Sequence, residues 1–153
     1  MISFHEEVFG GVQRAVCRGE RAETGGDTGK QARMQHGNAV DIVWRGGRML
    51  LGVGPKADGT LPGWQSEILR GIGRWMQVAG RWLPDLVADG ELEVEGAWTR
   101  LGRAGDSRLL FIDADVPVAI PAGRLLTPEW ASLEDGTLTC AEDRPGPAVV
   151  ELT

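Results

Sequence analysis

The most regular hydrophobic pattern in the chain lies between Trp64 and Leu83. At about 100° per residue, its apolar side chains fall on one face and its charged side chains on the other. Pro84 and the Asp89-Gly90 pair limit any continuation of a helix. The pattern predicts a long amphipathic helix over residues 64–83, whose buried face carries Trp64, Ile68, Leu69, Ile72, Trp75, Met76, Ala79, Trp82 and Leu83.

A second pattern precedes this helix, where two apolar segments flank Gly46 and Gly47. Paired glycines can supply the positive φ angles of a two-residue hairpin turn. Pairing residues 38–44 with residues 48–54 across that turn places the apolar side chains on one face of the ribbon. The sequence therefore predicts a hairpin with Val40, Ile42, Trp44, Met49, Leu51 and Val53 facing the core.

The remaining elements are shorter. Residues 91–99, 108–113, 116–120, 137–141 and 148–152 are strand-like, and Thr127-Pro128-Glu129 is typical of a helix start, which predicts a short helix with Trp130 and Leu133. At the N-terminus, Ser3 and Glu6 have the spacing of a capping box, so a helix is expected there, with a strand over residues 12–17 as the alternative. The polar, glycine-rich residues 18–38 predict a loop; a loop this long is usually functional, mobile or a misread element, and all three interpretations stay open.

These elements together predict the fold class. The order is helix, hairpin, long helix and then several antiparallel strands, which is α+β. We expect one globular domain over residues 1–153, with a mostly antiparallel sheet and the long helix packed on one of its faces. Hotdog thioesterases, PAS and GAF sensor domains and type III secretion chaperones share this layout, so it does not choose a function.

Composition and charge limit the classes of partner and the cellular location that can be expected. The 153 residues carry a net charge of −6, which argues against binding to bulk nucleic acid. No run of 18 apolar residues is present and the first residues lack a basic segment, so no membrane association and a cytoplasmic location are expected. Cys17 and Cys140 have no metal-site spacing, and we expect reduced thiols.

One short string suggests metal chemistry. Residues 109–116, LLFIDADV, form a hydrophobic strand that ends in Asp113 and Asp115, and two carboxylates at a strand end can hold Mg²⁺ or Mn²⁺. The string resembles the DxD segment of family-A glycosyltransferases and, more loosely, the first motif of haloacid-dehalogenase-type phosphatases. No nucleotide-binding βαβ unit precedes it, and Pro117 departs from the phosphatase pattern. We therefore expect a solvated strand end and no metal.

Other catalytic patterns are weak. Residues 25–30, GGDTGK, lack the first glycine and the final hydroxyl of a phosphate-binding loop, so a flexible loop is expected. His5 and His36 are the only histidines, which excludes a His-rich metal centre. His5 is expected to be a packed core residue and His36 to lie in the polar loop. No GxSxG motif is present, and the sequence predicts no cofactor.

Binding is the alternative to catalysis. Arg70, Arg74 and Arg81 form a stripe on the polar face of the long helix, which can dock an acidic partner or can be a solvated face. Trp64 and Trp82 lie at one edge of the apolar face, and tryptophan is enriched at interfaces. The main hypothesis is a non-enzymatic protein-protein interaction module, oligomeric or bound to a protein partner through these residues. The alternative is a small-ligand-binding or enzymatic domain with a pocket between the long helix and the sheet, lined by Trp75, Trp98 and His36.

Overall fold

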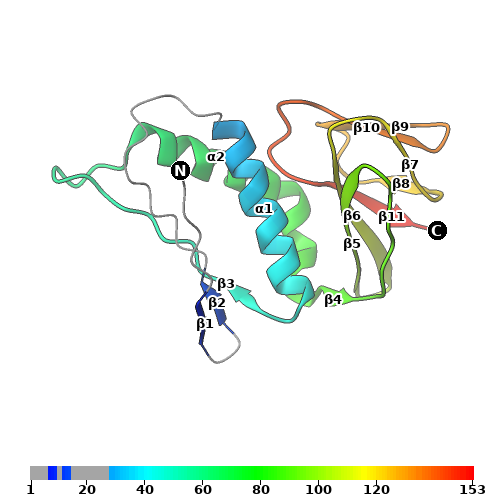
Figure 1. The fold of residues 1–153 in the computed structure, drawn as a ribbon, viewed down its shortest axis with the longest axis horizontal. Helices are drawn as coiled ribbons and strands as arrows, with labels where there is room; N and C mark the ends of the chain where they lie inside the picture. The colour runs from blue at the N-terminus through cyan, green and yellow to red at the C-terminus, as the bar shows by residue number, and fades with distance from the viewer. Residues whose placement is uncertain (1–6, 10–11, 15–27) are drawn as a thin grey trace.

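Two helices cover one face of an antiparallel sheet whose other face carries a second, smaller sheet (Figure 1). This computed structural model describes residues 7–9, 12–14 and 28–153, with side chains from residue 36 onward. The helices are α1 (Thr28–Trp44) and α2 (Gly63–Ala79), and a 3₁₀ segment, η1 (Gly80–Asp85), continues α2. Among the described residues, no helix is both long and apolar enough to cross a membrane.

The larger sheet has five strands in the order β4-β5-β6-β11-β8, and all of its neighbours are antiparallel. Its centre is the hairpin of β5 (Ala97–Ala104) and β6 (Ser107–Ala114), which turns at Gly105 with φ +60°. β11 (Ala148–Leu152) pairs with β6, while β4 (Val87–Ala88) and β8 (Gly123–Leu125) form the edges. The strands expected near 108–113 and 148–152 are therefore present.

The smaller sheet has the order β7-β10-β9. It consists of β7 (Val118–Ala119), β9 (Ala131–Glu134) and β10 (Thr137–Cys140). Neighbouring residues of β6 face opposite layers: Leu109 and Phe111 pack under the helices, whereas Leu110 and Ile112 pack against the smaller sheet. Because both faces of β6 are covered, its apolar residues run continuously along the sequence.

The hairpin expected around Gly46 and Gly47 is wrong. Residues 38–44 belong to α1, and the two glycines end that helix. The Gly46 N–H donates to the Val43 carbonyl and the Gly47 N–H to the Ile42 carbonyl, both at 2.8 Å. With φ +79° at Gly46, this is a Schellman C-cap, which needs the same positive φ as a hairpin turn. Gly47 leads into β3 (Arg48–Met49), which pairs in parallel with β2 (Val12–Arg14).

The single long helix expected over 64–83 is also wrong. α2 is α-helical for 17 residues, and the chain continues from Gly80 as a 3₁₀ turn that contains Pro84. The buried stripe is rotated as well, because α1 packs along one side of α2. Met76, predicted to be buried, is 42% exposed, and Trp64 and Trp82 are only partly buried. The stripe consists of Gln65, Ile68, Gly71, Trp75 and Ala79.

The N-terminal predictions change too. β1 (Glu7–Phe9) and β2 (Val12–Arg14) are antiparallel strands, so the expected first helix is wrong and the alternative strand is confirmed over 12–14. The capping box, His5 and residues 18–27 lie outside the described residues. From Thr28 the expected loop is instead helix α1.

Two further predictions fail for local reasons. The strand expected over 91–99 begins only at Ala97, after Gly96 with φ +78°. The short helix expected after Thr127 is absent from this described segment, and Leu133 lies in β9. The Thr127 hydroxyl accepts a hydrogen bond from the backbone N–H of Val149 at 3.0 Å, so it binds β11 instead of capping a helix. The α+β class stands, with two antiparallel sheets and a third, mixed sheet of order β1-β2-β3 among the described residues.

Candidate functional site

Asp113 and Asp115, the candidate metal ligands, both bind a buried arginine. Arg144 is 2% exposed. Its Nε donates to Asp113 Oδ1 at 2.6 Å, its Nη2 donates to Asp115 Oδ1 at 2.8 Å, and its Nη1 donates to the Ala141 carbonyl at 2.8 Å. Burial opposes the charge on Arg144, but the hydrogen bonds to Asp115 and Asp113 outweigh that effect and raise its pKa.

The expected solvated strand end is present in part: the Asp115 side chain is 78% exposed, whereas Asp113 is 22% exposed and both bind Arg144. The guanidinium lies where a metal ion bound by both carboxylates would have to sit, so the DxD resemblance does not extend to the surroundings of the motif. Within the described residues, no group of three or more His, Cys, Asp or Glu side chains is placed to hold a metal ion. The cluster of Arg144, Asp113 and Asp115 joins the turn after β10 to the end of β6, which is a structural role.

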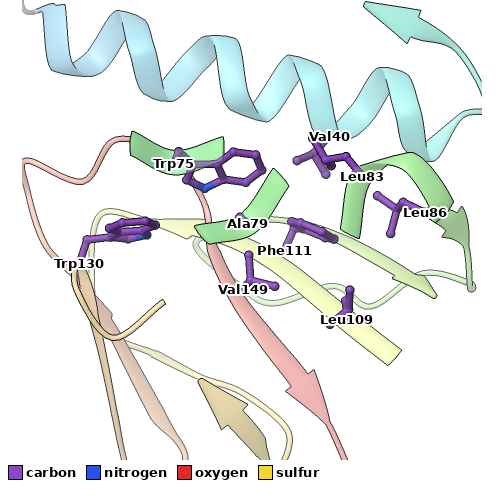
Figure 2. Close-up of a cluster of buried hydrophobic side chains, with 9 residues drawn as sticks. All are labelled: Val40, Trp75, Ala79, Leu83, Leu86, Leu109, Phe111, Trp130 and Val149. Atoms are coloured by element: carbon purple, nitrogen blue, oxygen red, sulfur yellow. The ribbon is translucent and has the colours of Figure 1, made fainter. Parts of the chain in front are cut away.

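The space between α2 and the sheet, where the alternative hypothesis placed a pocket, is filled. Trp75 is fully buried there, and its indole N–H donates to the Pro147 carbonyl at 2.9 Å. The His36 ring of α1 lies 4.7 Å from the Trp75 ring, between centroids. Gly146 lies so close to both rings that a Cβ would fall 2.5 Å from Trp75 Cδ1. Figure 2 shows Trp75 packed with apolar residues of the helices and the sheet.

A cavity of about 220 Å³ lies instead between the C-terminal end of α1 and strand β5. We call it the α1–β5 pocket. Helix α1 supplies an aromatic ring and the residue that follows it supplies a cation, β5 supplies a hydroxyl and a second cation, and the segment before β5 supplies two carboxylates. The lining residues are Trp44, Arg45, Gly90, Glu91, Leu92, Glu93, Thr99, Arg100 and Leu101.

Hydrogen bonds fix the walls of the α1–β5 pocket. The Trp44 indole N–H donates to the Leu101 carbonyl, which ties α1 to β5. The Arg100 guanidinium lies 5.3 Å from the Trp44 ring centroid and 5.3 Å from that of Trp98, and it pairs with Asp41. Asp41 also accepts from Arg45 Nε at 2.9 Å. One carboxylate of α1 therefore orients both arginines of the pocket.

The hydroxyl of the pocket has a similar structural partner. Thr99 Oγ1 donates to the Leu92 carbonyl at 2.6 Å, which holds the segment between Glu91 and Glu93 against β5. Residue patterns gave no signal for this pocket. The sequence predicts Trp44 on a hairpin and Glu91 and Glu93 on a strand, and only the packing of α1 against β5 brings them together.

The candidate partner-binding residues lie elsewhere. Arg70, Arg74 and Arg81 are exposed on α2 and η1, and Arg81 stacks on Trp82 at 4.1 Å from its ring centroid. Neither these arginines nor Trp64 and Trp82 line the α1–β5 pocket. Their partner-binding role and the expected cytoplasmic location stay predictions.

The comparisons with known proteins that find a match name alpha-L-fucosidase. Residues 34–81 match the family model described as "Alpha-L-fucosidase". Among curated proteins, none matches the sequence. Of the solved structures, the alpha-L-fucosidase isoenzyme 1 of Paenibacillus thiaminolyticus has a TM-score of 0.58 at 23% identity over 82% of this chain and 34% of that one.

Two further fucosidase structures agree. The Thermotoga maritima alpha-fucosidase in complex with a mechanism based inhibitor has a TM-score of 0.54 at 25% identity, over 80% of this chain and 34% of that one. A trapped covalent intermediate of the alpha-L-fucosidase of Bacteroides thetaiotaomicron has a TM-score of 0.50 at 21% identity, over 77% and 32%. The chain thus spans about a third of the length of these structures.

These matches contradict the hypothesis of a non-enzymatic, oligomeric interaction module. The family model and the similar structures all carry the name of one glycoside hydrolase. They favour the alternative, an enzymatic or ligand-binding domain, although its pocket does not lie between α2 and the sheet. The interaction hypothesis relied on missing catalytic motifs, and a motif can be missing from a chain that shares only part of its length with an enzyme.

Proposed function

We propose that this chain works as part of a glycoside hydrolase that cleaves α-L-fucosides. The observation that carries the proposal is the family match over residues 34–81. That range runs without interruption from α1 through β3 and the connecting segment to the end of α2, so it follows a structural unit and not an isolated motif. The likeness to fucosidase structures extends over the strands as well.

The described residues are suited to a supporting and substrate-binding role. Most glycoside hydrolases use a pair of carboxyl groups, about 5–5.5 Å apart where a covalent intermediate forms. Here several of the described carboxylates bind arginines in structural ion pairs: Asp41 with Arg45 and Arg100, Asp89 with Arg103 and Arg108, Asp113 and Asp115 with Arg144, and Glu151 with Arg124. Hydrogen bonds from Arg108 and Arg103 lower the pKa of Asp89, and hydrogen bonds from Ser107 and Arg124 lower the pKa of Glu151, so these two carboxylates are poor proton donors.

The proposal is tested on the native polypeptide that carries this sequence. An antibody against the chain captures it from its source cells, and the eluate is assayed with 4-nitrophenyl α-L-fucopyranoside. We expect release of 4-nitrophenol that depends on the antibody, and little release from 4-nitrophenyl β-D-galactopyranoside. An eluate that contains the chain and hydrolyses neither compound would overturn the proposal.

A further inference from the structure

We propose that the α1–β5 pocket binds one neutral sugar ring. The inference rests on the proposed function and extends it, because a fucoside substrate presents a neutral fucose ring and the pocket would hold that ring. The pocket belongs to the described part of the chain, and its lining includes none of His36, Asp113 and Asp115.

The size of the pocket suits a small ligand. Its volume of about 220 Å³ is below the roughly 300–1,000 Å³ of pockets that hold drug-sized ligands. The lining residues Arg45, Glu91 and Glu93 are exposed, so the pocket is open to solvent. An open pocket of this size accommodates a single ring while the rest of a longer glycan extends into solvent.

The charges of the pocket favour a neutral ligand. Two arginines, Arg45 and Arg100, lie near three carboxylates, Asp41, Glu91 and Glu93. An anion would face the glutamates and a cation would face the arginines, so either meets a like charge in the pocket. A sugar hydroxyl both donates and accepts hydrogen bonds, so it can donate to a glutamate and accept from an arginine.

The aromatic wall completes the match. Trp44 is partly exposed and lines the cavity, and the guanidinium groups of Arg100 and Arg45 lie 5.3 Å and 6.0 Å from its ring centroid. The part of the indole that these two groups leave uncovered is the apolar surface proposed to contact the C–H groups of a sugar ring. Its indole N–H is bound to the Leu101 carbonyl, and Thr99 is bound to the Leu92 carbonyl. Because these walls are held before a ligand arrives, binding loses little side-chain entropy, which favours the modest affinity that one ring can provide.

The test titrates the full chain with methyl α-L-fucopyranoside and follows binding by saturation-transfer difference NMR and backbone amide shifts. We expect saturable binding with shifts at residues 90–93 and 99–101. Glu93→Ala removes a charged hydrogen-bond acceptor and should weaken binding roughly tenfold. Glu95→Ala is the matched control, because Glu95 is exposed on the same segment but does not line the pocket, and it should change binding less than about twofold.

Other outcomes overturn the inference. These are no saturable binding of the fucoside, equal binding by the two glutamate variants, or tighter binding of inorganic phosphate than of the sugar. Trp44→Phe adds a second test of the aromatic wall, and circular dichroism shows whether that variant still folds. Fucoside hydrolysis by the native polypeptide without binding in the pocket refutes this inference alone, whereas binding without hydrolysis refutes the proposed function alone.

Discussion

At the scale of single residues, Arg144 shows how a buried charge is tolerated. Its guanidinium has carboxylate and carbonyl partners on all three nitrogen positions, from Asp113, Asp115 and Ala141. Breaking a buried, hydrogen-bonded ion pair from one side is expensive, because the remaining charge stays poorly solvated. The sequence placed Asp113 and Asp115 at a strand end, but nothing in it indicated that an arginine 29 residues beyond Asp115 would bind both.

Arg144→Met is therefore expected to lower the free energy of unfolding by about 3 kcal/mol. The matched control is Arg124→Met, since Arg124 also binds a carboxylate, that of Glu151, but its side chain is 72% exposed. An exposed ion pair contributes less than about 1 kcal/mol. Urea unfolding at neutral pH measures both variants, and equal losses would contradict the structural role given to Arg144.

The same geometry predicts the response to metals. Because Arg144 occupies the space between Asp113 and Asp115, millimolar Mg²⁺ or Mn²⁺ should leave the melting temperature unchanged, as a ligand that does not bind the folded state cannot stabilise it. Differential scanning fluorimetry with and without the metal measures this. A rise of several degrees that Asp115→Asn abolishes would contradict the structure and support the DxD resemblance.

At the scale of elements, glycine pairs explain why the hairpin prediction failed. A two-residue hairpin turn and a Schellman cap both need positive φ, so the Gly46-Gly47 pair is compatible with either. The pair forms a Schellman cap because the residues before it are helical: α1 begins at Thr28, inside a segment whose polarity predicts a loop. By contrast, the strands near 108–113 and 148–152 could be predicted, because dense apolar β-formers bounded by turns leave few alternatives.

The Schellman cap gives a test in which a glycine-to-alanine substitution should raise the free energy of unfolding inside α1 and lower it at the C-cap of that helix. Gly46→Ala forces a Cβ into φ +79° and should lower the free energy of unfolding by about 1–2 kcal/mol. Gly37→Ala is the control, because no described atom lies within 4 Å of a Cβ there and alanine favours the helix, so stability should rise by about 0.5–1 kcal/mol. Thermal unfolding of both variants measures the difference. A hairpin at this position would make Gly37→Ala neutral or harmful.

Strand β11 is tied to both of its neighbours by one carboxylate. Glu151 accepts from the Ser107 hydroxyl of β6 at 2.6 Å and from Arg124 of β8 at 2.6 Å, and these hydrogen bonds lower its pKa from 4.5. A lowered pKa in the folded state adds stability that is present above pH 4.5 and is lost as the pH falls through the folded value. The melting temperature should thus fall below pH 4.5, and Glu151→Gln should flatten that fall relative to Glu134→Gln on an exposed position of β9. An identical pH profile for both variants would contradict this role.

At the scale of the whole molecule, the α1–β5 pocket could not be predicted because residues 44–45 form one wall and residues 90–93 and 99–101 the other, and the two are far apart in the sequence. Trp44, Glu93 and Arg100 each follow an ordinary local pattern, and only the docking of α1 on the sheet edge joins them. The fold class was within reach of the sequence, since class depends on the types of elements and their order. The number of sheets was not, because the short strands β7, β8 and β9 leave weak patterns.

The central strand β6 packs against the helices with one face and against the smaller sheet with the other. This arrangement predicts how the molecule unfolds. Leu110 and Phe111 are adjacent and fully buried, but Phe111 packs under the helices while Leu110 packs against the smaller sheet. Leu110→Ala should cost about 2–5 kcal/mol and Phe111→Ala about 3–5 kcal/mol. If the layers form one cooperative unit, each variant shifts the helical signal at 222 nm and the tryptophan fluorescence by the same amount in urea, because both probes then report one transition. Separate transitions in Phe111→Ala, with the helical signal lost first, would instead mean that the helices and the pair of packed sheets fold as two units. The single domain expected over residues 1–153 would then be wrong.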